Sequence, residues 1–172
     1  MTTEIPDAVE AAIIKVAKNV NEQDRMTSDG LGSTGWTHQL NRQLGQMGVS
    51  LGYHPCGRSC QDLKNGWREF LWDLVWLRYS DDGKRLLGWP LALEHEWDLS
   101  DDEIDYDFEK LLLARAEHWA MVFQGGDAER HFGRMRRIVA ECDLVPNGER
   151  FLLLHWRNGG FTPHVFVKRM QS

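Results

Sequence analysis

Short apolar runs constrain the fold of this chain more than any other feature of its sequence. Most are rich in branched and aromatic residues, a composition typical of β-strands. They cover residues 49–55, 69–79, 86–97, 118–124, 151–157 and 162–170. Other segments place apolar residues at helical spacing, at 9–20, 36–48, 106–117 and 128–142. Strand and helix patterns that alternate in this way predict a mixed α/β domain built in layers.

Polar segments are expected to separate these elements. Residues 21–35 are polar and Gly-rich and predict a linker after the first helix, whereas the acidic residues 98–105 predict a loop before the third helix. The turn at 80–85, SDDGKR, lies between two apolar runs and predicts an antiparallel hairpin. The length of 172 residues is most simply that of a single domain.

The net charge limits the partners of this chain. A formal charge of −6 argues against broad, non-specific binding to nucleic acid. The charge is uneven, however: residues 94–109 hold nine acids and no Lys or Arg, and residues 127–172 hold eight Lys or Arg against five Asp or Glu. This division fits a metal site with phosphate contacts nearby, and it equally fits two solvated surfaces.

The cellular setting is expected to be the cytoplasm. No stretch approaches the ~20 apolar residues of a spanning helix, and the acidic N-terminus lacks the apolar region of an export signal. Three cysteines are too few for a disulfide framework, which favours a reducing compartment. We therefore expect no contact with a membrane, and the oligomeric state stays open.

One carboxylate interrupts the apolar run at 69–77, which reads EFLWDLVWL. The run predicts a strand that is apolar on both faces, with Asp73 inside it. An unpaired carboxylate buried there would cost roughly several kcal/mol. Asp73 is therefore expected to have a hydrogen-bonding partner, a cation or a metal ion.

The following strand carries two more carboxylates, in the sequence LALEHEW. Because side chains alternate along a strand, Glu94 and Glu96 should point to one face and His95 to the other. Asp73 can converge with this pair if the two strands are neighbours. Carboxylates held close together repel, and a bound divalent ion would relieve that repulsion. Oxygen ligands of this kind are those of Mg²⁺ or Mn²⁺.

These residues resemble the motif of the PD-(D/E)xK nuclease superfamily. The resemblance consists of WD at 72–73, ExE at 94–96 on the next strand, a helix, and then the strand HWAMVFQ. It implies a restriction-endonuclease-like core over residues 33–124, ordered helix, three strands, helix, strand. Residues 1–32 would be an N-terminal helix and linker, and residues 125–172 a C-terminal extension with a helix and two further strands. The phrases WREFLWDLVW and ALEHEW…DFEKLL also look like those of an uncharacterised bacterial branch of the superfamily.

The resemblance implies roles for individual residues. Asp73 matches the first acid of the motif and Glu94 the acid of the (D/E)xK pair, and both would bind the metal. Glu96 stands where the superfamily has Lys, which would normally orient the attacking water and stabilise developing charge. Glu96 would then be a further ligand or a base that orients water. Some members supply the missing charge from the following helix, where this chain offers Lys110.

Two alternatives stay open on the sequence alone. Asp73 can be balanced by Lys110 or by an Arg in a structural ion pair without any metal. The chain can also be a catalytically inactive relative that serves as a binding or regulatory module, as the missing Lys and the acidic charge suggest. The leading prediction from the resemblance is nevertheless a metal-dependent phosphodiesterase or nuclease, with nucleic acid as its possible partner.

Two further groups of residues were weighed. His54, Cys56 and Cys60 lie close together in sequence, but a fourth zinc ligand at regular spacing is missing, which favours ordinary structural residues. Arg130 and Arg134 fall on one face of a helix together with Arg137. They predict either a stripe that contacts phosphates or, more simply, a solvated helix face.

Overall fold

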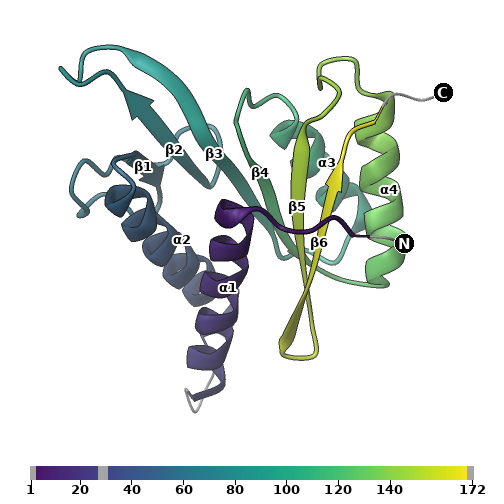
Figure 1. The fold of residues 1–172 in the computed structure, drawn as a ribbon. Helices are drawn as coiled ribbons and strands as arrows, with labels where there is room; N and C mark the ends of the chain where they lie inside the picture. Colours follow the sequence, from purple (N-terminus) through teal and green to yellow (C-terminus); the bar gives the residue numbers. More distant parts are fainter. Residues whose placement is uncertain (1–2, 27–30, 170–172) are drawn as a thin grey trace.

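The computed structural model describes residues 3–26 and 31–169. Its elements, in chain order, are α1 (Ala8–Met26), α2 (Gly32–Ser50), β1 (His54–Gly57), β2 (Leu74–Tyr79), β3 (Leu86–Glu96), α3 (Asp101–Leu111), β4 (Trp119–Gln124), α4 (Ala128–Glu141), β5 (Arg150–Arg157) and β6 (Gly160–Val167) (Figure 1). The fold is mixed α/β, as the alternating patterns of the sequence predicted.

One sheet contains all of these strands, in the order of the chain from β1 to β6. β1, β2 and β3 pair antiparallel, which confirms the predicted hairpin between β2 and β3. β3, β4 and β5 pair parallel, and β6 returns antiparallel to β5. Parallel neighbours need a crossover connection, and α3 and α4 supply the two that this order requires.

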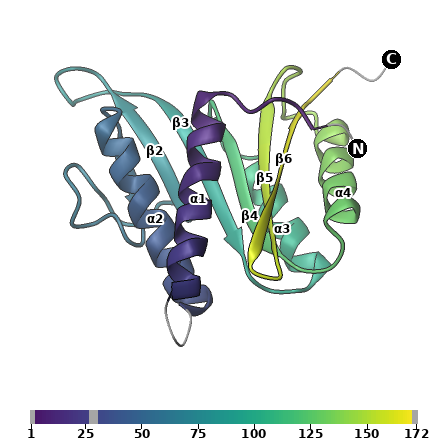
Figure 2. The same ribbon diagram turned by 60° about the horizontal axis from the view of Figure 1, so that its bottom comes forward.

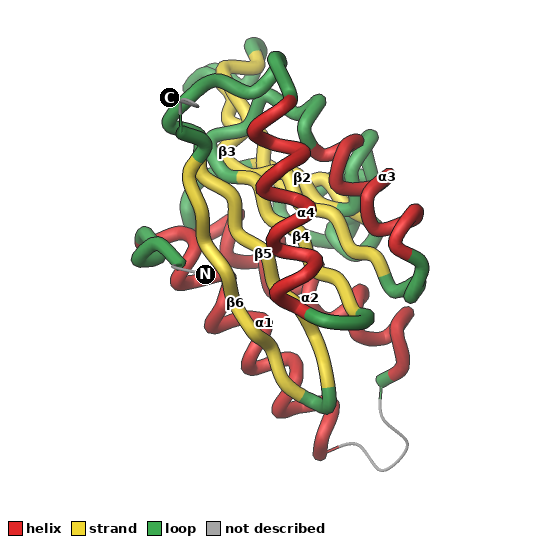
Figure 3. The backbone as a smooth tube through the Cα atoms, turned by 90° about the vertical axis from the view of Figure 1, so that its right-hand side faces the viewer, coloured by secondary structure: helices red, strands yellow, loops and turns green. Residues whose placement is uncertain are grey.

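Helices cover both faces of the sheet. α1 and α2 pack side by side across one face (Figure 2), and α3 and α4 lie against the other (Figure 3). Apolar side chains alternate along β4, so they point to both faces of the sheet and both faces must be covered by helices. Met121 and Phe123 point into the core beneath α3 and α4, whereas Ala120 and Val122 point into the core beneath α1 and α2.

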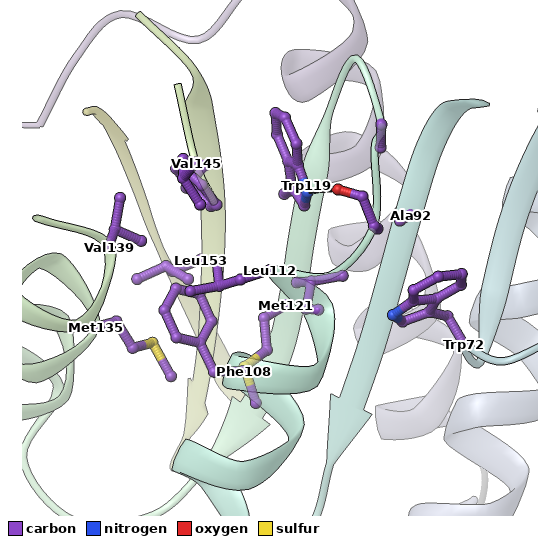
Figure 4. Close-up of a cluster of buried hydrophobic side chains, with 14 of the residues drawn as sticks. Trp72, Ala92, Phe108, Leu112, Trp119, Met121, Met135, Val139, Val145 and Leu153 are labelled. Atoms are coloured by element: carbon purple, nitrogen blue, oxygen red, sulfur yellow. Dashed lines mark hydrogen bonds between the residues drawn. The ribbon is translucent and has the colours of Figure 1, made fainter. Parts of the chain in front are cut away.

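The core beneath α3 and α4 is the larger of the two. Figure 4 shows its side chains meeting from both helices and from several strands: Phe108 of α3 and Leu112 directly after it, Met135 and Val139 of α4, Trp119 and Met121 of β4, and Leu153 of β5. Each large apolar side chain that is removed from water contributes about 1.5–3 kcal/mol. This core therefore holds α3 firmly on β3 and β4, which positions the site described below.

The predicted linker at 21–35 was wrong over the residues that the structure describes. α1 continues to Met26 and α2 begins at Gly32; residues 27–30 lie outside the described part. Long-range contacts hold the end of α1, because the Asn21 amide donates to Gly159 O at 2.8 Å and accepts from Trp156 Nε1 at 3.2 Å. These contacts join distant segments, so local composition could not indicate them.

Two element boundaries near the predicted site were also wrong. β2 begins at Leu74, so Asp73 precedes the strand and does not lie inside it. Leu71, with a φ of 65°, turns the backbone before the strand starts. α3 begins within the predicted acidic loop, at Asp101, because Ser100 caps it by accepting a hydrogen bond from Asp102 N. Lys110 therefore lies in the last turn of α3, whereas the helix expected at 106–117 would have placed it in the first turns.

Residues 125–169 are continuous with the rest of the fold. β5 adds to β4 through a parallel ladder from Trp119 to Gln124, and α4 packs on the same core as α3. The segment predicted as a C-terminal extension thus completes the sheet.

Candidate functional site

Asp73, Glu94 and Lys110 come from three different elements and lie together on the α3 side of the sheet. The first residue of β2, Leu74, pairs with Leu93 of β3, so Asp73 comes beside Glu94. Lys110 reaches the same place from α3, which packs against β3. The sequence predicted that Asp73 and Glu94 converge if their strands are neighbours, and it left open whether Lys110 reaches them; in the structure these residues lie together.

Glu94 is the most deeply buried member of this cluster, with a side chain only 1% exposed. Its Oε1 lies 3.0 Å from Lys110 Nζ, and the same ammonium lies 3.1 Å from Asp107 one helical turn earlier. Burial and the neighbouring charge of Asp73 raise the pKa of Glu94 to about 9, although Lys110 opposes the shift. Glu94 therefore takes up a proton more readily than an ordinary glutamate, and a further cation would oppose this.

Asp73 is balanced chiefly by His95. Its Oδ2 accepts a hydrogen bond of 2.8 Å from the backbone N–H of His95 and lies 3.1 Å from His95 Nδ1. Burial alone would raise the pKa of Asp73, but these contacts and a hydrogen bond with the Glu94 carboxyl group lower it to about 2. The carboxylate is therefore ionised, with its side chain 29% exposed.

Glu96 lies further along β3 and shares only Asp107 with the cluster. It accepts a hydrogen bond from the backbone N–H of Asp98 and faces Asp107. Burial and the nearby Asp107 carboxylate raise the pKa of Glu96. No contact joins Glu96 to Asp73 or Glu94 among the interactions of the described residues.

Of the three carboxylates expected to converge, Asp73, Glu94 and Glu96, only Asp73 and Glu94 are adjacent in the structure. Within residues 3–26 and 31–169, no group of three or more His, Cys, Asp or Glu side chains is arranged to hold a metal ion. Two carboxylates are still a donor set on which Mg²⁺ sites are built, because that ion usually keeps several waters and binds substrate phosphates.

Sequence reasoning missed two residues of the cluster, His95 and Asp107. Alternation along β3 predicted that His95 points away from the carboxylates, but Asp73 lies ahead of its strand, from where its Oδ2 contacts both the backbone N–H and the ring Nδ1 of His95. The spacing of Asp107 and Lys110, three positions apart on one helix, was a usable signal. The Asn41 amide borders the site through a 3.2 Å hydrogen bond to the Asp73 carbonyl oxygen.

The other candidate residues have structural partners. Cys56 and Cys60 are buried, and burial raises their pKa values to about 11 and 12, so neither is a thiolate at neutral pH. Arg134 forms ion pairs with Asp101, at 2.6 Å, and with Asp105. Arg130 also pairs with Asp101. The acidic and basic segments of the sequence therefore meet between α3 and α4.

Comparison of the chain with protein-family models, with curated proteins and with solved structures finds no match. No helix within the described ranges is long and apolar enough to cross a membrane. The geometry of the site therefore carries the functional argument by itself.

Proposed function

We propose that this chain is a divalent-metal-dependent phosphodiesterase that acts on nucleic acid, with a core of the PD-(D/E)xK type. The observation that carries the proposal is the meeting of Asp73, Glu94 and Lys110 from three separate elements. Two acids and one ammonium side by side are the groups that this chemistry needs. The motif residue that the sequence lacks, a strand Lys, would be replaced by Lys110.

The order of elements supports the proposal. α2, β1, β2, β3, α3 and β4 follow the sequence helix, three strands, helix, strand, and the hairpin β2–β3 leads through α3 into the parallel strand β4. The two acids sit on the hairpin strands or next to them, and the Lys sits on the crossover helix. Fold order alone does not define an activity, so the site must carry the chemical argument.

Asp73 and Glu94 would hold the metal ion, Mg²⁺ or Mn²⁺. The donor set fits, because one or two carboxylates together with water and phosphate oxygens are sufficient for Mg²⁺. Glu94 would give up its proton when it becomes a ligand, since metal binding requires deprotonated ligands. When bound, such an ion polarises a phosphate and lowers the pKa of a coordinated water.

Lys110 and Glu96 would act on the substrate beside these ligands. The Lys110 ammonium, 34% exposed and held by Glu94 and Asp107, can face a phosphate oxygen and stabilise the charge that develops on it. Glu96 has a raised pKa and partial exposure, which suit a base that accepts a proton from water. Its separation from Asp73 favours this role over that of a third ligand.

Calorimetric titration of Mn²⁺ and Mg²⁺ tests the proposal. Asp73→Asn and Glu94→Gln should each weaken metal binding more than tenfold, because each removes one of two charged ligands. Glu103→Gln is the matched control: Glu103 is an exposed acid of α3 and should leave binding unchanged. A nuclease assay on DNA and RNA with Lys110→Met should then show lost turnover with metal binding retained. A folded wild type that binds no metal at millimolar concentration would overturn the proposal.

A second candidate function is a catalytically inactive binding module on the same core. The observation that favours it is the contact of Asp73 Oδ2 with His95, at 2.8 Å to the backbone N and 3.1 Å to Nδ1, which gives this carboxylate oxygen partners without a metal ion. This candidate predicts that Asp73→Asn destabilises the protein but changes no metal affinity, because there is none to change. The same titration therefore separates the two functions.

A further inference from the structure

An aromatic pocket adjoins the candidate site on the same face of the sheet. It has a volume of about 730 Å³ and lies over β1, β2 and the start of β3, with the segment 66–70 as its rim. Its lining includes Trp67, Phe70, Tyr79 and Trp89. The volume of this site is within the range of small-molecule sites.

Two of these aromatic side chains are unusually open to solvent. Trp67 is 57% exposed and Phe70 is 50% exposed, and Leu86 beside them is 47% exposed. Large apolar side chains gathered at one place on a surface mark a binding site more often than a solitary one does. The floor is rigid, because Tyr79 and Trp89 pack against the buried core.

Trp72 forms the connection between this pocket and the candidate site. Its ring lies edge-on to Trp89, with centroids 5.0 Å apart, and its Nε1 donates a 3.2 Å hydrogen bond to the carbonyl oxygen of Lys110. It also directly precedes Asp73 in the chain. Figure 4 shows Trp72 at the end of the core that lies away from α4. A ligand that extends past Trp72 would therefore contact both the pocket and the Lys110 cluster.

From this arrangement we infer that the pocket binds an unpaired base of a single-stranded nucleic acid whose phosphate lies at Asp73, Glu94 and Lys110. The inference rests on the proposed function for the position of the phosphate. Exposed aromatic rings stack on bases of any sequence, since every base has a flat π-face. A base in this pocket cannot be stacked in a duplex at the same time, which makes the substrate single-stranded or locally opened.

The charge and hydrogen bonds of the pocket favour a base over an extended peptide. The rim carries one cation, Arg68, and one acid, Glu69, so the lining is close to neutral, as a base is. The edge of β1 next to the pocket is already paired: Trp67 N donates to Pro55 O at 2.9 Å, and Gly57 N donates to Trp67 O at 3.2 Å. A peptide therefore cannot add to this edge as a further strand.

Ligand-observed NMR in the presence of EDTA, which removes divalent ions, tests binding in the pocket independently of metal binding. The probes are adenosine, adenosine 5′-monophosphate and ribose 5-phosphate, which separate the base from the phosphate. The two adenine compounds should bind and ribose 5-phosphate should not. Trp67→Ala and Phe70→Ala should each weaken adenosine binding about tenfold, because each removes a stacking surface.

Two control variants keep this test independent of the proposed activity. Tyr106→Ala removes an aromatic ring that is 65% exposed on α3 and outside the pocket, and it should leave adenosine binding unchanged. Asp73→Asn should also leave it unchanged, even if that variant loses metal binding. The inference would be overturned if the wild type did not bind adenosine, or if both pocket variants bound adenosine as tightly as the wild type. Either result would leave the metal proposal intact. The inference would also be overturned if sedimentation showed that the wild type is a dimer and that Trp67→Ala dissociates it. The pocket would then be a contact between two copies of the chain.

Discussion

The Lys110 ammonium lies 3.0 Å from a carboxylate oxygen of Glu94, a side chain that is only 1% exposed. The pair joins the last turn of α3 to the middle of the sheet. A buried acid that is next to a second acid needs either a proton or a cation. Lys110 supplies part of this positive charge in the free protein, whether or not the site also binds a metal ion.

Replacement of Lys110 by Met should destabilise the protein by about 1–2 kcal/mol at pH 7. The change leaves Glu94 without its cation, but the cost is limited because Glu94 can hold a proton and because Lys110 is about one-third exposed. Urea unfolding followed by tryptophan fluorescence measures the difference. Lys110→Arg keeps the charge and should recover most of the loss. Equal stability of Lys110→Met and the wild type would show that the pair contributes nothing.

Arg134 links α3 and α4 through Asp101 and Asp105, with its side chain 28% exposed. Arg134→Met should lower the free energy of unfolding by about 1 kcal/mol, since it removes two ion pairs but keeps most of the aliphatic contact. The loss should shrink in 1 M NaCl, where screening is strong (a Debye length of about 3 Å). Arg137→Met, on the exposed side of the same helix, is the control and should change little. A salt-independent loss would assign the effect to packing.

Two buried histidines should make the protein less stable in mild acid. Burial lowers the pKa of His131, although Asp101 opposes the shift, and burial together with Arg136 lowers the pKa of His164. Between these lowered values and the ordinary pKa of about 6.5, the unfolded chain binds more protons than the folded one. The free energy of unfolding should therefore fall as the pH falls below about 6.5.

His164→Gln removes one of these protonation sites and should flatten that fall. Urea unfolding of the wild type and the variant at several values between pH 8 and pH 5 measures both slopes. Comparison at pH 8, where the histidine is neutral, separates any cost of packing from the protonation effect. A slope that the substitution leaves unchanged would contradict a role for His164.

The layered α/β fold was predictable because it depends on local patterns. The apolar runs located the strands, and the turn at 80–85 indicated the β2–β3 hairpin. The start of α3 was also predictable in principle. Ser100 followed by Glu103 is the spacing of a capping box, a signal that outweighs the acidic composition of the segment.

The site was predictable only in part, because its geometry depends on contacts between distant residues. The resemblance indicated Asp73 and Glu94 and offered Lys110 from the following helix, and the structure brings these residues together. The contact between Asp73 and His95 depends on where β2 begins, because Asp73 lies just before the strand. The positive φ of Leu71 sets that boundary. Neither the aromatic pocket nor the pairing of Arg134 with Asp101 has a local signal, since each joins elements that the sequence places far apart.

Gly66 offers a test of the segment that carries Trp67. A Cβ atom at Gly66 would lie 1.7 Å from the carbonyl oxygen of Cys60, so any side chain there must displace the backbone. The same segment is fixed to β1 by the hydrogen bond from Trp67 N to Pro55 O. Gly66→Ala should therefore destabilise the protein by about 2–3 kcal/mol through overpacking.

Gly160→Ala is the matched control, because the nearest atom to its Cβ, Arg157 O, is 3.9 Å away. That substitution should change the free energy of unfolding by less than about 0.5 kcal/mol. Urea unfolding of the two variants and the wild type gives the comparison. Gly66→Ala should also weaken adenosine binding, since displacement of the segment moves Trp67 away from the pocket. A Gly66→Ala protein of wild-type stability would show that residues 60–67 do not pack as described.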